Sequence, residues 1–306
     1  SKYDIVTVGE GFGINLKNGL NYVAENEKEL NMIFHFDHLT IDFGPKGKYD
    51  PIPLDFIRFK EIFTKWDNLL ANKGWNSIFL GNHDFSRIVS RFGNDKEYRV
   101  ESSKLLITLI MTLRGTPYIY QGDEIGMTNV SYPSIDFYND IETLNAWKEA
   151  SINGENMSEF LNAVHLHSRD NSRTPMQWNL ERNSGFTIGD PWIQVNKNYK
   201  NINVLSQLKD SNSILNYYKR IIAFRKLNTT LVYGNYKDLE PNHPYLFVYK
   251  RWDENNEFLI IHNFSEKYLG LKKKITLNYN LVILNYENVK NKNKIRPWET
   301  RVYKSR

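Results

Sequence analysis

The chain has 306 residues, of which 41% are hydrophobic and 14% aromatic, so it can bury a sizeable core. It contains no cysteine, which excludes disulfides and thiolate metal sites, and it has no run of roughly 18 apolar residues that would predict a membrane span. The net charge is +5, and residues 271–306 alone hold ten Lys or Arg against two Glu, but no recognition motif accompanies these charges, so we expect no nucleic-acid partner.

Two apolar runs near the start of the chain predict strands that end on acidic or imidazole groups. Residues 3–10 read Tyr-Asp-Ile-Val-Thr-Val-Gly-Glu and place the carboxylate of Glu10 at the end of the first run. Residues 32–37 form the second run, and we interpret the side chains of Asp37 and His38 at its end as structural or as part of the outer pocket.

Helices and further strands alternate after these runs. The apolar positions of the first helix recur at spacings of four, three and four before Gly74, and they are Phe59, Phe63, Trp66 and Leu70. We expect a second helix around residues 106–113, a strand over 116–120 and a last helix over 214–224. This alternation predicts an α/β fold with parallel strands.

A third apolar run delivers polar side chains to one end of a strand. Residues 78–80 read Ile-Phe-Leu, which is typical of a strand buried on both faces, and Asn82, His83 and Asp84 follow at once. Because loops after parallel strands build active sites, we expect Glu10 and Asp84 to lie across one pocket. The alternative is that Asn82 and Asp84 cap the next segment and His83 is a buried imidazole.

Residues 121–210 are polar and rich in Asn, Gly and Pro, and they are longer than an ordinary connection between elements. Four aromatic residues within this segment indicate that it is ordered, namely Trp178, Phe186, Trp192 and Tyr199. Three acids could be mistaken for a metal site, and we interpret them as surface acids because their spacing matches no metal-binding loop: Asp136, Asp140 and Glu142.

Short alternating or β-branched runs follow from about residue 232. They are separated by Asn, Gly and Lys and lie at residues 245–250, 258–262, 275–277, 281–284 and 300–304. Runs of this kind predict a small antiparallel all-β domain.

Three stretches resemble signature regions of the α-amylase superfamily of glycoside hydrolases. They are Thr7-Val-Gly-Glu10, Asn82-His83-Asp84 and residues 169–178, which read Arg-Asp-Asn-Ser-Arg-Thr-Pro-Met-Gln-Trp. They are most similar to the branch of oligo-1,6-glucosidases, dextran glucosidases, trehalose-6-phosphate hydrolases and sucrose isomerases. The resemblance implies the C-terminal half of a (β/α)₈ TIM barrel over residues 1–231, with a long insertion at about 121–210, followed by an antiparallel β domain over 232–306.

The resemblance also implies a reaction, which is retaining hydrolysis of terminal α-1,6-linked glucose in isomalto-oligosaccharides. Glu10 would be the general acid/base, and Asp84 would hold the glucose 2- and 3-hydroxyls and stabilise the transition state. His83 and Arg169 would bind the substrate glucose, although a surface salt bridge with Asp170 is the alternative for Arg169. This chemistry needs no metal and no cofactor, and the resemblance implies a cytoplasmic enzyme.

The nucleophile expected from the resemblance has no counterpart in this sequence. In the superfamily the nucleophilic aspartate lies in a Gly-x-Arg-x-Asp pattern on an earlier strand, and none of the 306 residues fit that pattern. We therefore expect this chain to be a piece of a larger enzyme and to be inactive alone. We also expect it to expose an apolar edge, which would pair with a complementary N-terminal half.

The resemblance leaves two alternatives to an α-1,6-glucosidase. Phe85-Ser86 stands where the branch usually has Gln-Pro, and this departure puts substrate preference in doubt. The alternatives are a trehalose-6-phosphate hydrolase, and an inactive amylase-fold remnant or partner protein.

Overall fold

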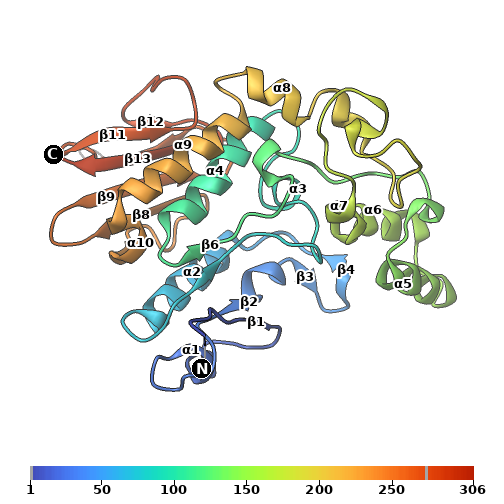
Figure 1. Ribbon diagram of the computed structural model, residues 1–306, viewed down its shortest axis with the longest axis horizontal. Coiled ribbons are helices and arrows are strands. Elements are labelled where there is room, and N and C mark those ends of the chain that lie inside the picture. The colour runs from blue at the N-terminus through green and yellow to red at the C-terminus, as the bar shows by residue number, and fades with distance from the viewer. Residues whose placement is uncertain (1–2, 273–274) are drawn as a thin grey trace.

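The computed structural model describes residues 3–272 and 275–306 and contains a helical part with short parallel strands, followed by an antiparallel sheet (Figure 1). The strands of the helical part are β1 Val8–Gly11, β2 Met32–His35, β3 Phe43–Gly44, β4 Gly47–Pro51, β5 Ser77–Ile78 and β6 Thr116–Pro117. The helices are α1 Leu20–Val23, α2 Phe56–Leu70, α3 Ile88–Phe92, α4 Arg99–Thr112, α5 Ile141–Ile152, α6 Met157–His167, α7 Asp170–Arg173, α8 Val204–Lys209, α9 Ile214–Leu227 and α10 Thr229–Tyr233. The sheet strands are β7 Asn235–Asp238, β8 Leu246–Trp252, β9 Glu257–Asn263, β11 Tyr279–Leu284 and β13 Thr300–Ser305, and β10 Leu269–Gly270 and β12 Lys294–Ile295 form a separate antiparallel pair.

Two parallel strand pairs form the layer that carries the predicted polar loops. β1 pairs with β2, and β5 pairs with β6. The rings of Phe34 in β2 and Phe79 after β5 lie 4.9 Å apart, and Phe34 also meets Tyr118 after β6 at 4.6 Å, so the two pairs lie side by side. The predicted parallel α/β arrangement is confirmed, although the strand expected over residues 3–10 begins only at Val8.

The amphipathic helix predicted before Gly74 is α2. Asp55 caps it by accepting a hydrogen bond from the backbone N of Arg58 at 3.0 Å, and its apolar stripe is buried. Trp66 in this stripe donates from Nε1 to Oδ2 of Asp37 at 2.8 Å, while His38 is buried nearby. The structural interpretation of Asp37 and His38 is therefore confirmed.

Helix α4 lies at the centre of the molecule, between the parallel strands and the antiparallel sheet. Nearly all of its residues are buried, as expected for a helix packed on all sides. Thr108 shares a hydrogen bond of 2.7 Å with Tyr217 of α9, and Thr112 shares one of 2.5 Å with Tyr249 of β8. No helix in the described part of the chain is long and apolar enough to cross a bilayer.

The antiparallel sheet has the strand order β11-β13-β9-β8-β7 and confirms the predicted all-β region. The prediction of a strand over residues 275–277 is wrong, because these residues form a turn and β11 begins at Tyr279. Ile275 still packs against the buried apolar residues of the sheet, so its apolar character reflects packing of a turn. Sequence periodicity missed β7, whose Asn-Tyr-Lys-Asp sequence lacks an apolar alternation.

The segment 121–210 is ordered, as predicted, but not for the predicted reason. Trp178, Phe186 and Trp192 are about half exposed or more, so they contribute little to its packing. The segment instead folds around an apolar cluster of its own, which contains Val130, Tyr132, Tyr138, Ala150, Phe160 and Val164. Helices α5 and α6 carry the last three of these residues.

Lys60 of α2 connects this helix to the antiparallel sheet. Its side chain is fully buried, and Nζ donates to the carbonyl oxygens of Glu240, His243 and Leu246 at 2.7, 2.8 and 3.0 Å. All three acceptors precede or begin β8, so a single ammonium group stabilises the junction between the two parts of the fold.

We expect Lys60→Met to lower the free energy of unfolding by about 2–4 kcal/mol, because the apolar stem is kept while three carbonyls lose a charged donor. Urea denaturation measures the change. Lys65→Met on the same helix is the matched control, since Lys65 is half exposed and pairs only with Glu61, and its change should stay within about 0.5 kcal/mol. Equal effects of the two substitutions would contradict this role of Lys60.

Candidate functional site

A hollow of about 230 Å³ lies at the carboxyl ends of the parallel strands. Its wall includes Glu10 from the end of β1, residues 81–83 after β5, and residues 118–120 after β6. Phe34 and Phe79 provide an aromatic floor. Active sites of parallel α/β folds form at this end of the strands, so this hollow is the candidate functional site.

The hollow brings Glu10 together with His83, while Asp84 stands next to the wall. Glu10 is an exposed side chain in register with Phe34 of β2. The side chain of His83 is 60% exposed, and its Nε2 lies 3.3 Å from Oδ2 of Asp84. Glu10 and Asp84 thus belong to one region, but His83 rather than Asp84 lines the hollow together with Glu10. The sequence prediction expected Glu10 and Asp84 to lie across one pocket, whereas Asp84 is not among the residues that line this hollow.

Asn82 and Asp84 have different roles in the loop after β5. The side chain of Asn82 accepts a hydrogen bond from the backbone N of Asp84 at 2.8 Å, which is the turn-forming role considered as the alternative. Asp84 instead uses Oδ1 to accept from Nη2 of Arg173 at 2.8 Å and from Nη1 of Arg169 at 3.4 Å. Asn82 therefore stabilises the turn of this loop, and the carboxylate of Asp84 pairs with the guanidinium groups of Arg169 and Arg173.

Arg169 is held by acids other than its neighbour Asp170. Its Nε and Nη2 donate to Oδ1 of Asp140 at 2.9 and 2.6 Å, and Nε also lies 3.3 Å from Oε2 of Glu142. Asp170 instead accepts backbone hydrogen bonds from Asn139 and Asp140. The alternative of a salt bridge with Asp170 is wrong. The interpretation of Asp140 as a surface acid is also wrong, since only 2% of it is exposed.

Arg173 is a site residue that sequence reasoning missed. Its Nε donates to the carbonyl oxygen of His83 at 2.9 Å, in addition to its bond with Asp84. The available signal was its position four residues after Arg169, because residues four apart on a helical turn such as α7 share one side.

Phe85, the residue that departs from the usual pattern, does not line the hollow. It is buried, and its ring lies 5.9 Å from that of Phe36 and 6.3 Å from that of Phe43. Lys48 is nearby, and its Nζ pairs with Oε2 of Glu142 at 2.8 Å. Burial lowers the pKa of Lys48. Phe85 therefore packs against Phe36, which lines the hollow, but is not itself a lining residue.

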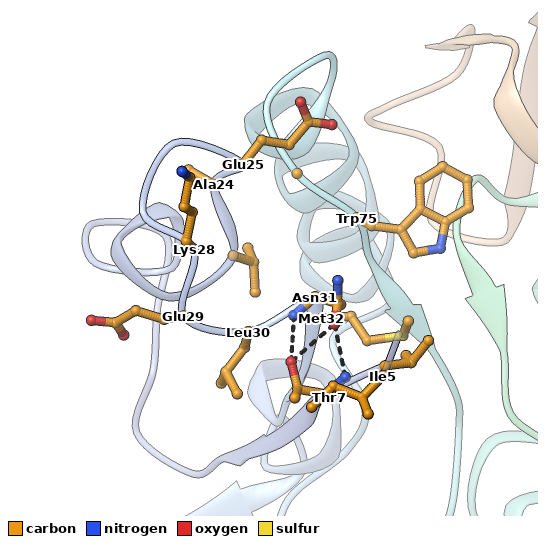
Figure 2. A pocket seen from close by; sticks show the side chains of 13 residues that line it. Ile5, Thr7, Ala24, Glu25, Lys28, Glu29, Leu30, Asn31, Met32 and Trp75 are labelled. Atoms are coloured by element: carbon orange, nitrogen blue, oxygen red, sulfur yellow. Dashed lines mark hydrogen bonds between the residues drawn. The ribbon is translucent and has the colours of Figure 1, made fainter. Parts of the chain in front are cut away.

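A larger hollow of about 670 Å³ lies at the amino ends of β1, β2 and β5 (Figure 2). Thr7 and Asn31 line this hollow and form two hydrogen bonds with each other. Thr7 N donates to Asn31 Oδ1 at 2.8 Å, and Asn31 N donates to Thr7 Oγ1 at 3.0 Å. Its other walls include Ile5, Leu30 and Trp75. It lies at the strand ends opposite Glu10, so it is not the candidate functional site despite its size. Across residues 3–272 and 275–306, no group of three or more His, Asp or Glu could hold a metal ion.

The ion pairs of Asp140 predict a pH dependence of stability. Burial on its own raises the pKa of Asp140, but hydrogen bonds from Arg169 and Thr143 hold this pKa below its ordinary value of 3.8. A carboxyl with a lowered folded pKa stabilises the fold above its ordinary value, and this contribution is lost as the pH falls through the folded pKa. We expect Asp140→Asn to lower stability at pH 7 by about 1–3 kcal/mol, with a gap from the parent that shrinks below about pH 4.

Urea denaturation at pH 7 and pH 3 measures this gap. Asp136→Asn is the control, because Asp136 is exposed and, among the described residues, its side chain accepts a hydrogen bond only from Ser134, so its gap should be near zero at both pH values. A gap for Asp140→Asn that persists unchanged at pH 3 would show that its cause is not ionisation.

Comparisons with known proteins identify the family of this chain. The catalytic-domain model of the α-amylase family matches residues 1–234. The chain is 48% identical over 315 residues to an oligo-1,6-glucosidase of Parageobacillus thermoglucosidasius, covering 100% of this chain and 56% of that protein. It is 42% identical over 284 residues to the trehalose-6-phosphate hydrolase of Escherichia coli (strain K12), covering 92% of this chain and 52% of that protein.

Among solved structures, the isomaltulose synthase of Klebsiella sp. LX3 matches with a TM-score of 0.95 at 37% identity, covering 100% of this chain and 56% of that chain. The chain thus spans about half the length of the curated relatives that it matches. It belongs to the α-amylase family, in the branch of oligo-1,6-glucosidases and trehalose-6-phosphate hydrolases that its motifs predicted.

Proposed function

We propose that this chain supplies the acid/base part of an α-glucosidase that releases terminal α-1,6-linked glucose from isomalto-oligosaccharides with retention. The observation that carries the proposal is the presence of Glu10 from β1 and the His83–Asp84 loop from β5 at the carboxyl ends of the parallel strands, where both contribute to or adjoin one hollow. The 48% identity to an oligo-1,6-glucosidase over the whole chain supports the choice of substrate.

Each site residue has a role in this proposal. Glu10 reaches the hollow from β1, where it would protonate the leaving oxygen and then take a proton from the attacking water. Asp84 would accept hydrogen bonds from the 2- and 3-hydroxyls of the glucose, and exposed His83 would bind a neighbouring hydroxyl. Arg169 and Arg173 would hold the Asp84 carboxylate in position, and Arg169 would also contact the glucose.

A retaining reaction needs a second carboxyl about 5–5.5 Å from the acid/base, and no Gly-x-Arg-x-Asp pattern in this chain provides it. The start of the helical part offers a surface for the missing strands. Val6 and Phe12 beside β1 are 71% and 72% exposed, and Ile5 is also exposed. We therefore propose that the chain is the C-terminal half of a (β/α)₈ barrel, and that a complementary N-terminal half covers this edge and brings the nucleophile.

The second candidate function is hydrolysis of trehalose 6-phosphate, which the 42% identity to that hydrolase over 92% of the chain favours. The third is an inactive amylase-fold remnant or partner protein. The four residues Glu10, His83, Asp84 and Arg169 remain together with their supporting ion pairs, which favours an enzyme over a remnant. We also propose a cytoplasmic location, which rests on the resemblance alone.

We expect the purified 306-residue chain to release no glucose from isomaltose, because it carries no nucleophile pattern. Co-expression with the part of the Parageobacillus relative that this chain does not match should give a complex that does release glucose. In this complex, kcat/KM for isomaltose should exceed that for trehalose 6-phosphate by at least about tenfold, or about 1.4 kcal/mol.

Coupled-enzyme detection of glucose measures all of these rates, and Asp84→Asn in the complex is the negative control. Glucose release by the chain alone would contradict the need for a partner. Preference of the complex for trehalose 6-phosphate would support the second candidate, and a stable complex with no activity on either substrate would support the third.

A further inference from the structure

A hollow of about 550 Å³ lies between the helical part and the antiparallel sheet. None of its lining residues lines the candidate functional site. We call it the interdomain pocket, and residues 98–104, 210–220, Tyr268 and 284–297 contribute to it. In Figure 1 these segments belong to α4 and α9 and to the loops that flank β11 and β12. Its volume is within the roughly 300–1,000 Å³ typical of small-molecule sites.

The sheet side of the interdomain pocket is held in place by hydrogen bonds. Asn285 is buried and donates from Nδ2 to the carbonyl oxygen of Glu101 in α4 at 2.9 Å, which connects the loop after β11 to the helix. The hydroxyl of Tyr286 donates to the carbonyl oxygen of Pro297 at 2.7 Å. The guanidinium of Arg296 stacks 3.8 Å from the centre of the Tyr286 ring. A wall fixed in this way needs little reorganisation to receive a ligand.

The charges around the interdomain pocket nearly cancel. Its lining cations are Lys104, Arg220, Lys290 and Arg296, and its lining carboxylates are Glu101, Asp210 and Glu287. Arg296 pairs with Glu299 at 3.1 Å, but Glu299 also pairs with Arg301 at 2.9 Å, so the four lining cations exceed the three lining carboxylates by one charge. Among the described residues, none of the three lining carboxylates forms an ion pair, and only Oδ1 of Asp210 accepts a hydrogen bond, from the backbone N of Asn212 at 2.8 Å, so the other oxygens remain available as acceptors. A ligand without net charge but with many hydroxyls matches this lining better than an anion does.

Aromatic rings complete the lining. Tyr98 comes from the start of α4, Tyr286 from the loop after β11, and Tyr268 from the loop after β9. Tyr268 is 64% exposed, so its ring offers a free apolar face with a polar hydroxyl. The apolar faces of sugar rings stack on such surfaces while their hydroxyls bond to nearby amides and charged groups.

We propose that the interdomain pocket is a second carbohydrate site, which binds a neutral α-gluco-oligosaccharide away from the site of cleavage. The cavity, the fixed Tyr286 wall, the nearly balanced charges and the exposed Tyr268 ring carry this proposal, and the choice of α-glucan rests on the proposed function. A chain that holds a glucan at this pocket keeps the glucan at high local concentration around the same molecule.

Native gel electrophoresis in the presence of dextran, a neutral α-1,6-glucan, tests this proposal without requiring hydrolysis. All variants of the 306-residue chain carry Asp84→Asn, which weakens sugar binding at the candidate functional site. We expect dextran to retard the parent. We expect Tyr268→Ala to raise the apparent Kd for dextran by at least about tenfold, whereas Tyr268→Phe should keep most of the binding because the ring remains.

Tyr233→Ala is the matched control, since Tyr233 of α10 is a similarly exposed tyrosine outside the pocket, and dextran should retard this variant like the parent. Absence of retardation in the parent, or equal retardation of Tyr268→Ala and the parent, would overturn the proposal. Retardation by dextran sulfate but not by dextran would overturn it too, because the pocket would then recognise charge. Since no outcome depends on glucose release, failure of the proposed hydrolysis remains distinguishable from failure of this site.

Discussion

Two guanidinium groups and the carboxylate of Asp84 form the interaction on which the candidate functional site depends. Nη2 of Arg173 and Nη1 of Arg169 approach the same oxygen of Asp84, at 2.8 and 3.4 Å. Asp140 in turn accepts two hydrogen bonds from Arg169. Removing one member would leave an uncompensated charge in a largely desolvated place, so these ion pairs hold the loop after β5 against segment 121–210. The position of His83 at the hollow follows from this arrangement.

Buried arginines stabilise the scaffold beneath the site in a related way. Arg251 donates to the carbonyl oxygens of Thr112 and Gly234, both at 2.7 Å, and Arg225 donates to those of Met111 and Leu113. These carbonyls lie at or near the ends of helices, where the backbone has no partner within the helix. Burial lowers the pKa of both arginines to about 10, so both remain charged at neutral pH and keep the sheet attached to the helices.

Sequence reasoning could predict the elements and residues that leave a local signal. The stripe that contains Trp66 identified α2, and the short motifs placed Glu10 and His83 at one end of the parallel strands. It could not predict the partners of Arg169, because its ion pair with Asp140 joins residues 29 positions apart and such pairs produce no periodic pattern. Sequence reasoning could not predict the burial of Phe85 either, because the side chain of a loop residue beside a motif can point into the site or into the core.

The central claim is that Glu10 is the general acid/base, and the most direct test compares two leaving groups. In the complex with the complementary half, Glu10→Gln should lower kcat/KM for isomaltose by about a hundred- to ten-thousandfold, because its alkoxide leaving group needs a proton. For p-nitrophenyl α-glucoside, whose phenolate leaves without protonation, the loss should be about tenfold or less. Equal losses on both substrates would contradict the acid/base role and would indicate that Glu10 only supports the structure of the site.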